Sequence, residues 1–197
     1  MPELLLEILS EEIPARMQPR AAEDLKRLIC DDLKAERLLF TNARSFATPR
    51  RLTLVVEGVP EHQPDFKKET KGPAIDAPEK AINGFLGSVG LTLDQCEKRE
   101  VKGKEFWFAV VEEKGQPIQD VLHGVLYRAI WNFPWPKSMR WSDLDLAWAR
   151  PIHGIVAVFN GQQMSTLSIP TRKTGAPSGP DSITPSNQTV GHRFMAP

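Results

Sequence analysis

The sequence has few cysteines and no long apolar run, and both shortages restrict the class of protein. Its two cysteines, Cys30 and Cys96, match no zinc-binding or redox spacing, so we expect a reduced protein without a metal site. No apolar run approaches the roughly 20 residues that cross a bilayer. The start "MPELLLEILSEE" also lacks the basic end and long apolar stretch of a signal peptide. We therefore expect a soluble, cytoplasmic protein with no membrane partner.

Catalytic and nucleotide-binding motifs are also missing. Neither a GxxxxGK[ST] loop nor a GxGxxG after a strand occurs, and there is no Ser-His-Asp signature. The histidines form no HxH or HxxxH pair, which favours surface or core positions over metal ligation: His62, His123, His153 and His192. Glu11 and Glu12 are candidates for an acid–base pair, although the first turn of a helix also favours adjacent carboxylates. The sequence predicts no self-contained catalytic centre and no cofactor bound by this chain.

The charges balance over the whole chain but not along it. Lys plus Arg and Asp plus Glu number 25 each, so bulk charge does not indicate a nucleic-acid partner. Residues 1–40 hold nine acidic and six basic side chains, whereas residues 137–197 hold six basic and three acidic ones. A polyanionic partner is therefore a local hypothesis only.

The first 60 residues have the pattern of a β-α-β unit. "ELLLEIL" (3–9) is a short apolar run that predicts a buried strand. Residues 14–39 carry apolar side chains at helical spacing and predict a helix. In "SFATPRRLTLVV" (45–56), apolar and polar side chains alternate after the two arginines, which predicts a second strand.

The rest of the chain predicts one further helix-and-strand region with an insertion before it. Residues 61–96 are expected to form an exposed linker with a short helix that begins near Pro78. Residues 97–169 are expected to contain a hairpin at Lys102-Gly103, a helix after Pro117 and two strands joined at Asn160-Gly161. Residues 170–197 are rich in Gly, Pro and Ser, and predict a loop and the start of the next segment of a longer chain.

Together these elements predict an α+β fold, in which residues 1–60 and 97–169 form one domain with helices packed on a largely antiparallel sheet. A ferredoxin-like or RRM-like core with an inserted helix is the more specific version of this prediction.

Basic residues beside aromatics or prolines are the chemistry that remains. "RSFATPRR" contains Arg44, Arg50 and Arg51; "FPWPKSMRW" contains Lys137 and Arg140; and "GHRF" contains Arg193. Arginine matches phosphate geometry and aromatic rings stack on bases, which suits single-stranded RNA. The structural alternative has equal weight, because tryptophans near prolines are often core residues and Arg140 has Asp143 and Asp145 as acidic neighbours.

Seven blocks, in this order, resemble the N-terminal part of the beta subunit of bacterial heterotetrameric glycyl-tRNA synthetase. They are "LLLEI", "EEIPAR", "FATPRRL", "KGP", "PKSMRW", "RPI" and "GHRF", and they run from about Leu4 to Phe194. Two departures stand out: the family commonly has Gly-Thr where this chain has Leu9-Ser10, and Arg-Trp where it has His153-Gly154. If the family's arginine contacts RNA, His153 cannot make the same contact in this chain.

The resemblance implies a partner rather than an active site. In this family a separate alpha subunit activates glycine with ATP and Mg, and the beta subunit supplies tRNA recognition in a heterotetramer of two alpha and two beta subunits. The implied partners are therefore the alpha subunit, tRNA(Gly) and a second beta subunit. The beta N-terminal region is also thought to be similar to RNA-binding parts of archaeal CCA-adding enzymes and to be related to alanyl-tRNA synthetase.

Three functional hypotheses follow. The first is a non-catalytic tRNA-binding module, with Arg44, Arg51 and the cations of the later blocks as RNA contacts. In a regular strand Arg50 lies on the face of Leu52, so for Arg50 we expect a structural ion pair or a helix-end contact. The second hypothesis is an assembly module that docks the alpha subunit or later beta-subunit domains. The third, a hydrolytic editing domain, has no visible nucleophile.

Overall fold

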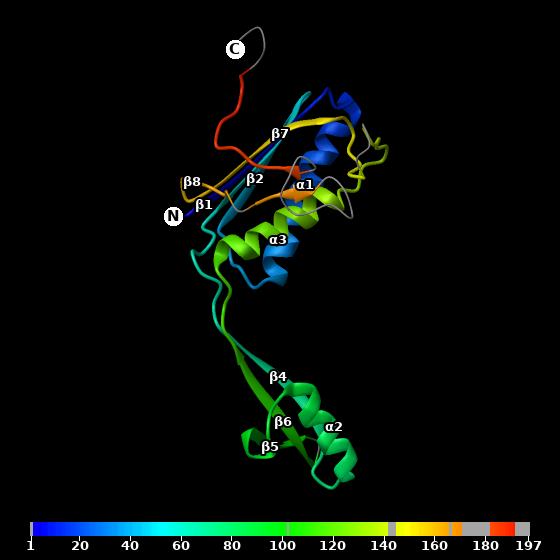
Figure 1. Cartoon of the computed structure of the whole chain (residues 1–197), viewed down its shortest axis with the longest axis vertical. Coiled ribbons are helices and arrows are strands. Elements are labelled where there is room, and N and C mark those ends of the chain that lie inside the picture. The colour runs from blue at the N-terminus through cyan, green and yellow to red at the C-terminus, as the bar shows by residue number, and fades with distance from the viewer. Residues whose placement is uncertain (1, 102, 142–144, 166, 171–181, 192–197) are drawn as a thin grey trace. The chain divides into compact units, whose positions relative to one another are not determined.

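The computed structural model describes residues 2–101, 103–141, 145–165, 167–170 and 182–191, which divide into two compact units. The larger unit comprises residues 1–63 and 116–197, and the smaller one comprises residues 64–115. Figure 1 shows the elements of both units. Within the described residues, no helix combines the length and the apolar character needed to cross a bilayer.

A five-stranded antiparallel sheet organises the larger unit. Its strand order is β2-β3-β1-β7-β8, so the first strand of the chain lies at the centre. The strands are β1 (Glu3–Ser10), β2 (Asn42–Thr48), β3 (Arg51–Glu57), β7 (Ile152–Phe159) and β8 (Gln162–Gln163). β7 and β8 are joined at Asn160 and Gly161, as expected from the sequence, and both residues have positive φ (48° and 77°). This is the backbone that a tight Asn-Gly hairpin turn requires.

Two helices cover one face of this sheet, α1 (Gln18–Ala35) and α3 (Ile118–Trp131), as Figure 1 shows. A short 3-10 helix, η1 (Ala15–Met17), precedes α1. In β1 and β3 alternate side chains are buried, and these belong to the same core as the apolar side chains of both helices. The helix periodicity in the sequence predicted this packing correctly.

Arg128 of α3 links the two helices at the edge of the core. Its Nε donates to Asp32 in the last turn of α1 at 2.8 Å, and its Nη2 donates to Glu36, the residue directly after α1, at 3.0 Å. The hydrogen bond to Asp32 is the main cause that raises the pKa of the Arg128 guanidinium. This cation therefore serves the packing of α3 on α1.

The stretch 45–56 differs from the single strand that the sequence predicted. It forms the hairpin β2–β3, with a turn at Pro49 and Arg50. Proline has no N–H to donate to a strand partner and fixes φ near the value that a turn needs. The first 60 residues are therefore β-α-β-β rather than β-α-β, and Arg50 lies in the turn rather than on a strand face.

The smaller unit contains a three-stranded antiparallel sheet in the order β4-β6-β5. Its elements are β4 (Phe66–Ala74), α2 (Glu79–Val89), the 3-10 helix η2 (Leu93–Gln95), β5 (Cys96–Val101) and β6 (Lys104–Glu113). This division differs from the expected one. The β5–β6 hairpin belongs to this unit rather than to the main sheet, and part of the expected exposed linker is strand β4.

The last described residues return to the larger unit. β9 (Ile169–Pro170) pairs with β10 (Ser182–Ile183), and Ser186 exchanges backbone hydrogen bonds with the edge of β7 at Ile155 (2.8 Å) and Ala157 (3.2 Å). The whole is an α+β fold with antiparallel sheets, as the sequence predicted. The ferredoxin-like core remains a prediction.

Candidate functional site

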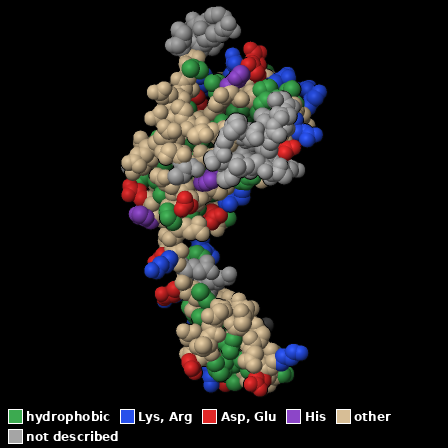
Figure 2. All heavy atoms as spheres, in the orientation of Figure 1, with side chains coloured by type: hydrophobic (Ala, Val, Ile, Leu, Met, Phe, Trp, Pro, Cys, Tyr) green, Lys and Arg blue, Asp and Glu red, His purple; other side chains and the backbone are tan. Residues whose placement is uncertain are grey.

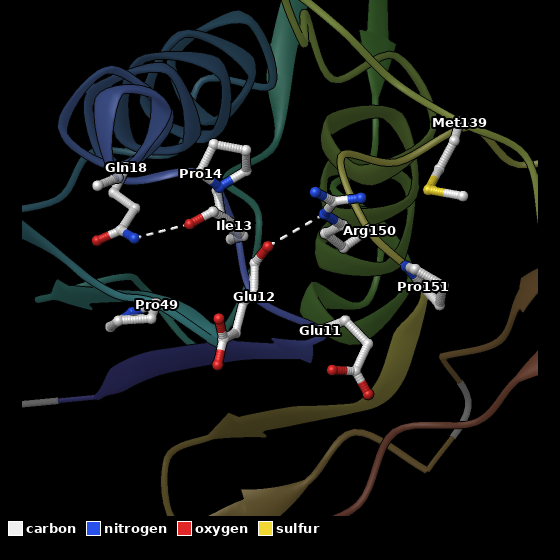
Figure 3. Close-up of a pocket in the computed structure, with 10 residues that line it drawn as sticks. Glu11, Glu12, Ile13, Pro14, Gln18, Pro49, Met139, Arg150 and Pro151 are labelled. Carbon is white, nitrogen blue, oxygen red and sulfur yellow. Dashed lines mark hydrogen bonds between the residues drawn. The ribbon is translucent and has the colours of Figure 1, made fainter.

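Four sequence blocks that lie far apart along the chain meet at one end of the five-stranded sheet. They line an open pocket of about 690 Å³, which we call the motif pocket. It is lined by residues 11–15, Gln18, Pro49, Met139, Arg150 and Pro151. Figure 3 shows Pro14, Gln18 and Pro49 on one side, Arg150, Pro151 and Met139 on the other, and Glu12 between them.

Backbone hydrogen bonds hold the walls of the motif pocket. Glu11 N–H donates to the carbonyl of Pro151 (3.0 Å), and Ile13 N–H donates to the carbonyl of Pro49 (2.6 Å). Met139 is fixed by two backbone hydrogen bonds with Trp148, at 2.8 and 3.0 Å. Pro49 and Pro151 have no N–H to donate, but their carbonyls accept hydrogen bonds. The loops around the pocket are therefore held together by single backbone hydrogen bonds rather than by sheet pairing.

Glu11 is the electrostatic centre of this end of the sheet. His153 Nε2 lies 2.6 Å from Glu11 Oε1, and Arg50 Nη2 lies 3.3 Å from the same oxygen. The hydrogen bond from His153 lowers the pKa of the Glu11 carboxyl below its usual range. Partial burial opposes this effect, and the Arg50 charge adds to it. Arg50 Nε also donates to the Ser10 carbonyl at 3.3 Å, so Arg50 ties its turn to the end of β1. Glu11 and Glu12 lie in the loop after β1 rather than in a helical first turn.

The lowered pKa of Glu11 predicts a pH effect on stability. The unfolded chain binds this proton near the ordinary pKa of 4.5, and the folded chain binds it only at lower pH. The stabilisation is thus present above about pH 4.5 and is lost as the pH falls further. We expect the Tm of Glu11→Gln to fall less than that of the unmodified chain between pH 6 and pH 3.5.

The effect is expected to be small, because both partners of the pair are half-exposed. Circular dichroism melts at several pH values would measure it, with Glu23→Gln as a control for the loss of one exposed carboxylate. An equal acid sensitivity of both variants would contradict the assignment of this pH effect to Glu11.

Glu12 and Arg150 are the polar groups that face the motif pocket without such pairing. Arg150 Nε donates to the backbone carbonyl of Glu12 at 3.1 Å. Within the described residues, the Glu12 carboxylate and the terminal nitrogens of Arg150 make no hydrogen bond or ion pair. Figure 3 shows the carboxylate pointing away from the guanidinium, so the pocket holds a separate acceptor and donor.

The predicted RNA-binding arginines of the β2–β3 hairpin are engaged with carboxylates. Arg44 Nη2 lies 2.6 Å from Glu57 Oε1, and Arg51 Nε lies 3.3 Å from Glu7 Oε1. Arg51 also donates to the Val190 carbonyl, and its side chain is only 21% exposed. Both arginines lie on the sheet face opposite the helices, since their registers place them beside half-buried rather than buried positions.

The later cations differ in their surroundings. Lys137 is exposed, and Arg140 is 68% exposed with its Nη1 4.0 Å from Asp145. They flank Met139 of the motif pocket in sequence. Arg193 lies outside the described residues, as does Asp143. On the face of the molecule that Figure 2 shows, the basic side chains of the described residues are interspersed with acidic ones.

The aromatics of "FPWPKSMRW" belong to the core or pack against it. Trp135 packs against Phe133 and Trp148, with ring centroids 4.6 and 5.0 Å apart. Trp148 is fully buried. Trp135 thus fits the core alternative rather than a base platform. The sequence pointed to Glu12 only as a candidate acid–base partner of Glu11, and it did not point to Arg150, although the blocks that contain them, "EEIP" and "RPI", stand out in the sequence.

Comparison with known proteins gives a consistent result over nearly the whole chain. The family model described as glycyl-tRNA synthetase beta subunit matches residues 4–197. The "Glycine--tRNA ligase beta subunit" of Paracoccus denitrificans is 47% identical over all of this chain, and that of Cereibacter sphaeroides is 48% identical. The protein of the same name from Phenylobacterium zucineum is 44% identical. The chain spans only 27 to 28% of the length of these relatives.

Proposed function

Because the chain belongs to the family of glycyl-tRNA synthetase beta subunits, we propose that it is the N-terminal, non-catalytic region of such a subunit. In this proposal it contributes to tRNA binding and to subunit assembly for the ATP-dependent ligation of glycine to tRNA(Gly). ATP and Mg are used by the alpha subunit, and the complex is a cytoplasmic heterotetramer of two alpha and two beta subunits.

The tRNA-binding role is supported mainly by the exposed basic residues on either side of Met139. Lys137 and Arg140 are exposed and flank Met139 in the sequence, and Met139 lines the motif pocket together with Arg150. Within the described residues, Lys137 makes no ion pair, and Arg140 lies 4.0 Å from Asp145, at the outer limit of an ion pair. Cations that are not neutralised by the protein are available to phosphates, and release of counterions then contributes to binding.

The assembly role is favoured by the opposite behaviour of the β2–β3 hairpin. Arg44 and Arg51 are neutralised by Glu57 and Glu7, and Phe46 between them in sequence is 51% exposed. An exposed aromatic ring among paired charges suits a protein surface better than a phosphate backbone. In this second candidate function, the hairpin docks the alpha subunit or a later beta-subunit domain.

The charge-reversal variant Lys137→Glu/Arg140→Glu tests the tRNA-binding role in the complete ligase. We expect its affinity for tRNA(Gly) at low salt to fall about ten-fold or more, because two phosphate contacts are lost and two repulsions are added. The Tm and the co-purification of the alpha subunit should not change, since both side chains are exposed. Fluorescence anisotropy with labelled tRNA(Gly) measures the affinity.

Lys26→Glu/Arg27→Glu is the matched control, because it reverses two exposed cations on α1, outside the motif pocket. If both variants lose the same affinity, the effect is one of net charge and not of this segment. If tRNA affinity is unchanged while Phe46→Ala releases the alpha subunit, the assembly role is supported and the RNA role of this segment is contradicted.

A further inference from the structure

We propose that the motif pocket binds one unpaired ribonucleotide of an RNA. The Glu12 carboxylate accepts a hydrogen bond from the ribose 2′-hydroxyl, the proline side chains contact the base, and Arg150 contacts a phosphate. The inference deepens the proposed tRNA-binding function and rests on it.

The size and the walls of the motif pocket suit a single base with its sugar. Its volume is about 690 Å³, within the range of small-ligand sites. Pro14, Pro49 and Pro151 line it together with Met139. Rigid proline rings and a polarisable thioether offer flat apolar contact that does not depend on which base is present. The pocket therefore selects for an unstacked base rather than for a sequence.

Glu12 gives the motif pocket a preference for a hydroxyl donor. The backbone on both sides of Glu12 is fixed by the Glu11–Pro151 and Ile13–Pro49 hydrogen bonds. Glu11 is already engaged by His153 and Arg50, whereas the Glu12 carboxylate makes no bond within the described residues. An ionised carboxylate only accepts hydrogen bonds and repels phosphate, so on a nucleotide it pairs with a base N–H or a ribose hydroxyl. Of these donors, the 2′-hydroxyl is the one that has the same position in every ribonucleotide, which suits a pocket whose apolar walls do not select one base. The 2′-hydroxyl distinguishes RNA from DNA in the same way elsewhere.

Arg150 supplies the complementary group for the anionic end of the same nucleotide. Its Nε is held by the Glu12 carbonyl at 3.1 Å, which leaves both terminal nitrogens for an incoming oxyanion. The hydrogen bond from Arg150 to the Glu12 carbonyl thus fixes the guanidinium, which donates, relative to the Glu12 carboxylate, which accepts. The two groups point to different parts of the pocket (Figure 3). A nucleotide carries a hydroxyl and a phosphate on one sugar and fits this pair. A lysine or arginine side chain of a partner protein matches Glu12 but is repelled by Arg150.

The test uses the complete ligase and two fluorescein-labelled probes, hexa-adenylate RNA and its DNA counterpart, in anisotropy titrations at low salt. The unmodified ligase is expected to bind the RNA more tightly, and Glu12→Ala is expected to reduce this RNA-over-DNA preference about ten-fold. Glu23→Ala, which removes an exposed carboxylate of α1, should leave the preference unchanged. Arg150→Gln should weaken both probes by a similar factor, and melting curves confirm that each variant is folded.

Three results would overturn the proposal. Equal binding of both probes by the unmodified ligase excludes recognition of the 2′-hydroxyl, and the tRNA-binding function is then still judged by the Lys137→Glu/Arg140→Glu experiment. Tighter binding of both probes by Glu12→Ala, with an unchanged preference, makes Glu12 a repulsive charge only. Loss of the alpha subunit from Glu12→Ala, with unchanged probe binding, assigns the pocket to a cationic side chain of a protein.

Discussion

Leu6→Ala is expected to lower the free energy of unfolding of the larger unit by about 3 to 5 kcal/mol, whereas Leu5→Ala should cost about 1 kcal/mol. The two leucines are neighbours on the central strand β1, but their side chains point to opposite faces of the sheet. Leu6 is 0% exposed in the core shared with α1 and α3, and Leu5 is half-buried on the other face.

The large cost arises because truncation of Leu6 leaves a cavity between strands that cannot move closer together. Leu6 pairs with Leu54 of β3 on one side and with Ala157 of β7 on the other. Urea denaturation followed by circular dichroism would measure both variants. Similar costs for Leu5 and Leu6 would contradict the assignment of the two faces.

Gly58→Ala is expected to be the next most disruptive change, with a cost of about 2 to 4 kcal/mol. Gly58 has a φ of +76°, and a Cβ at this position would lie 2.6 Å from the hydroxyl oxygen of Thr41. Thr41 cannot easily move away, because its hydroxyl donates to the Glu57 carbonyl at 2.9 Å. Both backbone strain and a steric clash therefore act against alanine.

Gly161→Ala is the matched control for the backbone term. Gly161 has a φ of +77°, but among the described residues beyond its two chain neighbours no atom lies within 4 Å of an added Cβ, so we expect a cost of only about 1 kcal/mol. Thr41→Ala removes the two closest atoms and should reduce the cost of Gly58→Ala when the two changes are combined. If the Gly58 and Gly161 variants lose equal stability, the clash with Thr41 does not contribute.

The sequence predicted the parts of the fold that depend on local periodicity. The helical spacing of Leu25, Ile29 and Leu33 and the Asn160-Gly161 turn each determine their structure within a few residues. Strand β4 was not predicted, because in "FKKETKGPA" charged residues dominate and its partner β6 lies far along the chain. Charge pairs such as Lys67–Glu112, at 2.7 Å, become visible only when the two strands are aligned.

The candidate site was predictable as a list of blocks but not as an arrangement. The sequence cannot show that Glu12, Pro49 and Arg150 line one cavity, because long-range pairing of loops determines it. Nor could it show that Arg51 has Glu7 as its partner, since that pair depends on the register of β1 against β3. Predictions of RNA contacts from basic motifs alone therefore missed which cations are already neutralised.

The position of the smaller unit within the chain affects how the larger one can fold. Residues 64–115 separate β3 from α3, yet Gln116 N–H donates to the Gln63 side chain at 2.9 Å, so the two ends of the insertion meet. The antiparallel pairing of β4 with β6 brings the same ends together from inside the insertion. Once that pairing forms, the connection from β3 to α3 behaves as a short loop, and the entropy lost on closing it is smaller. We therefore expect the insertion to hold its own two ends together and to shorten the time in which β7 finds its place beside β1.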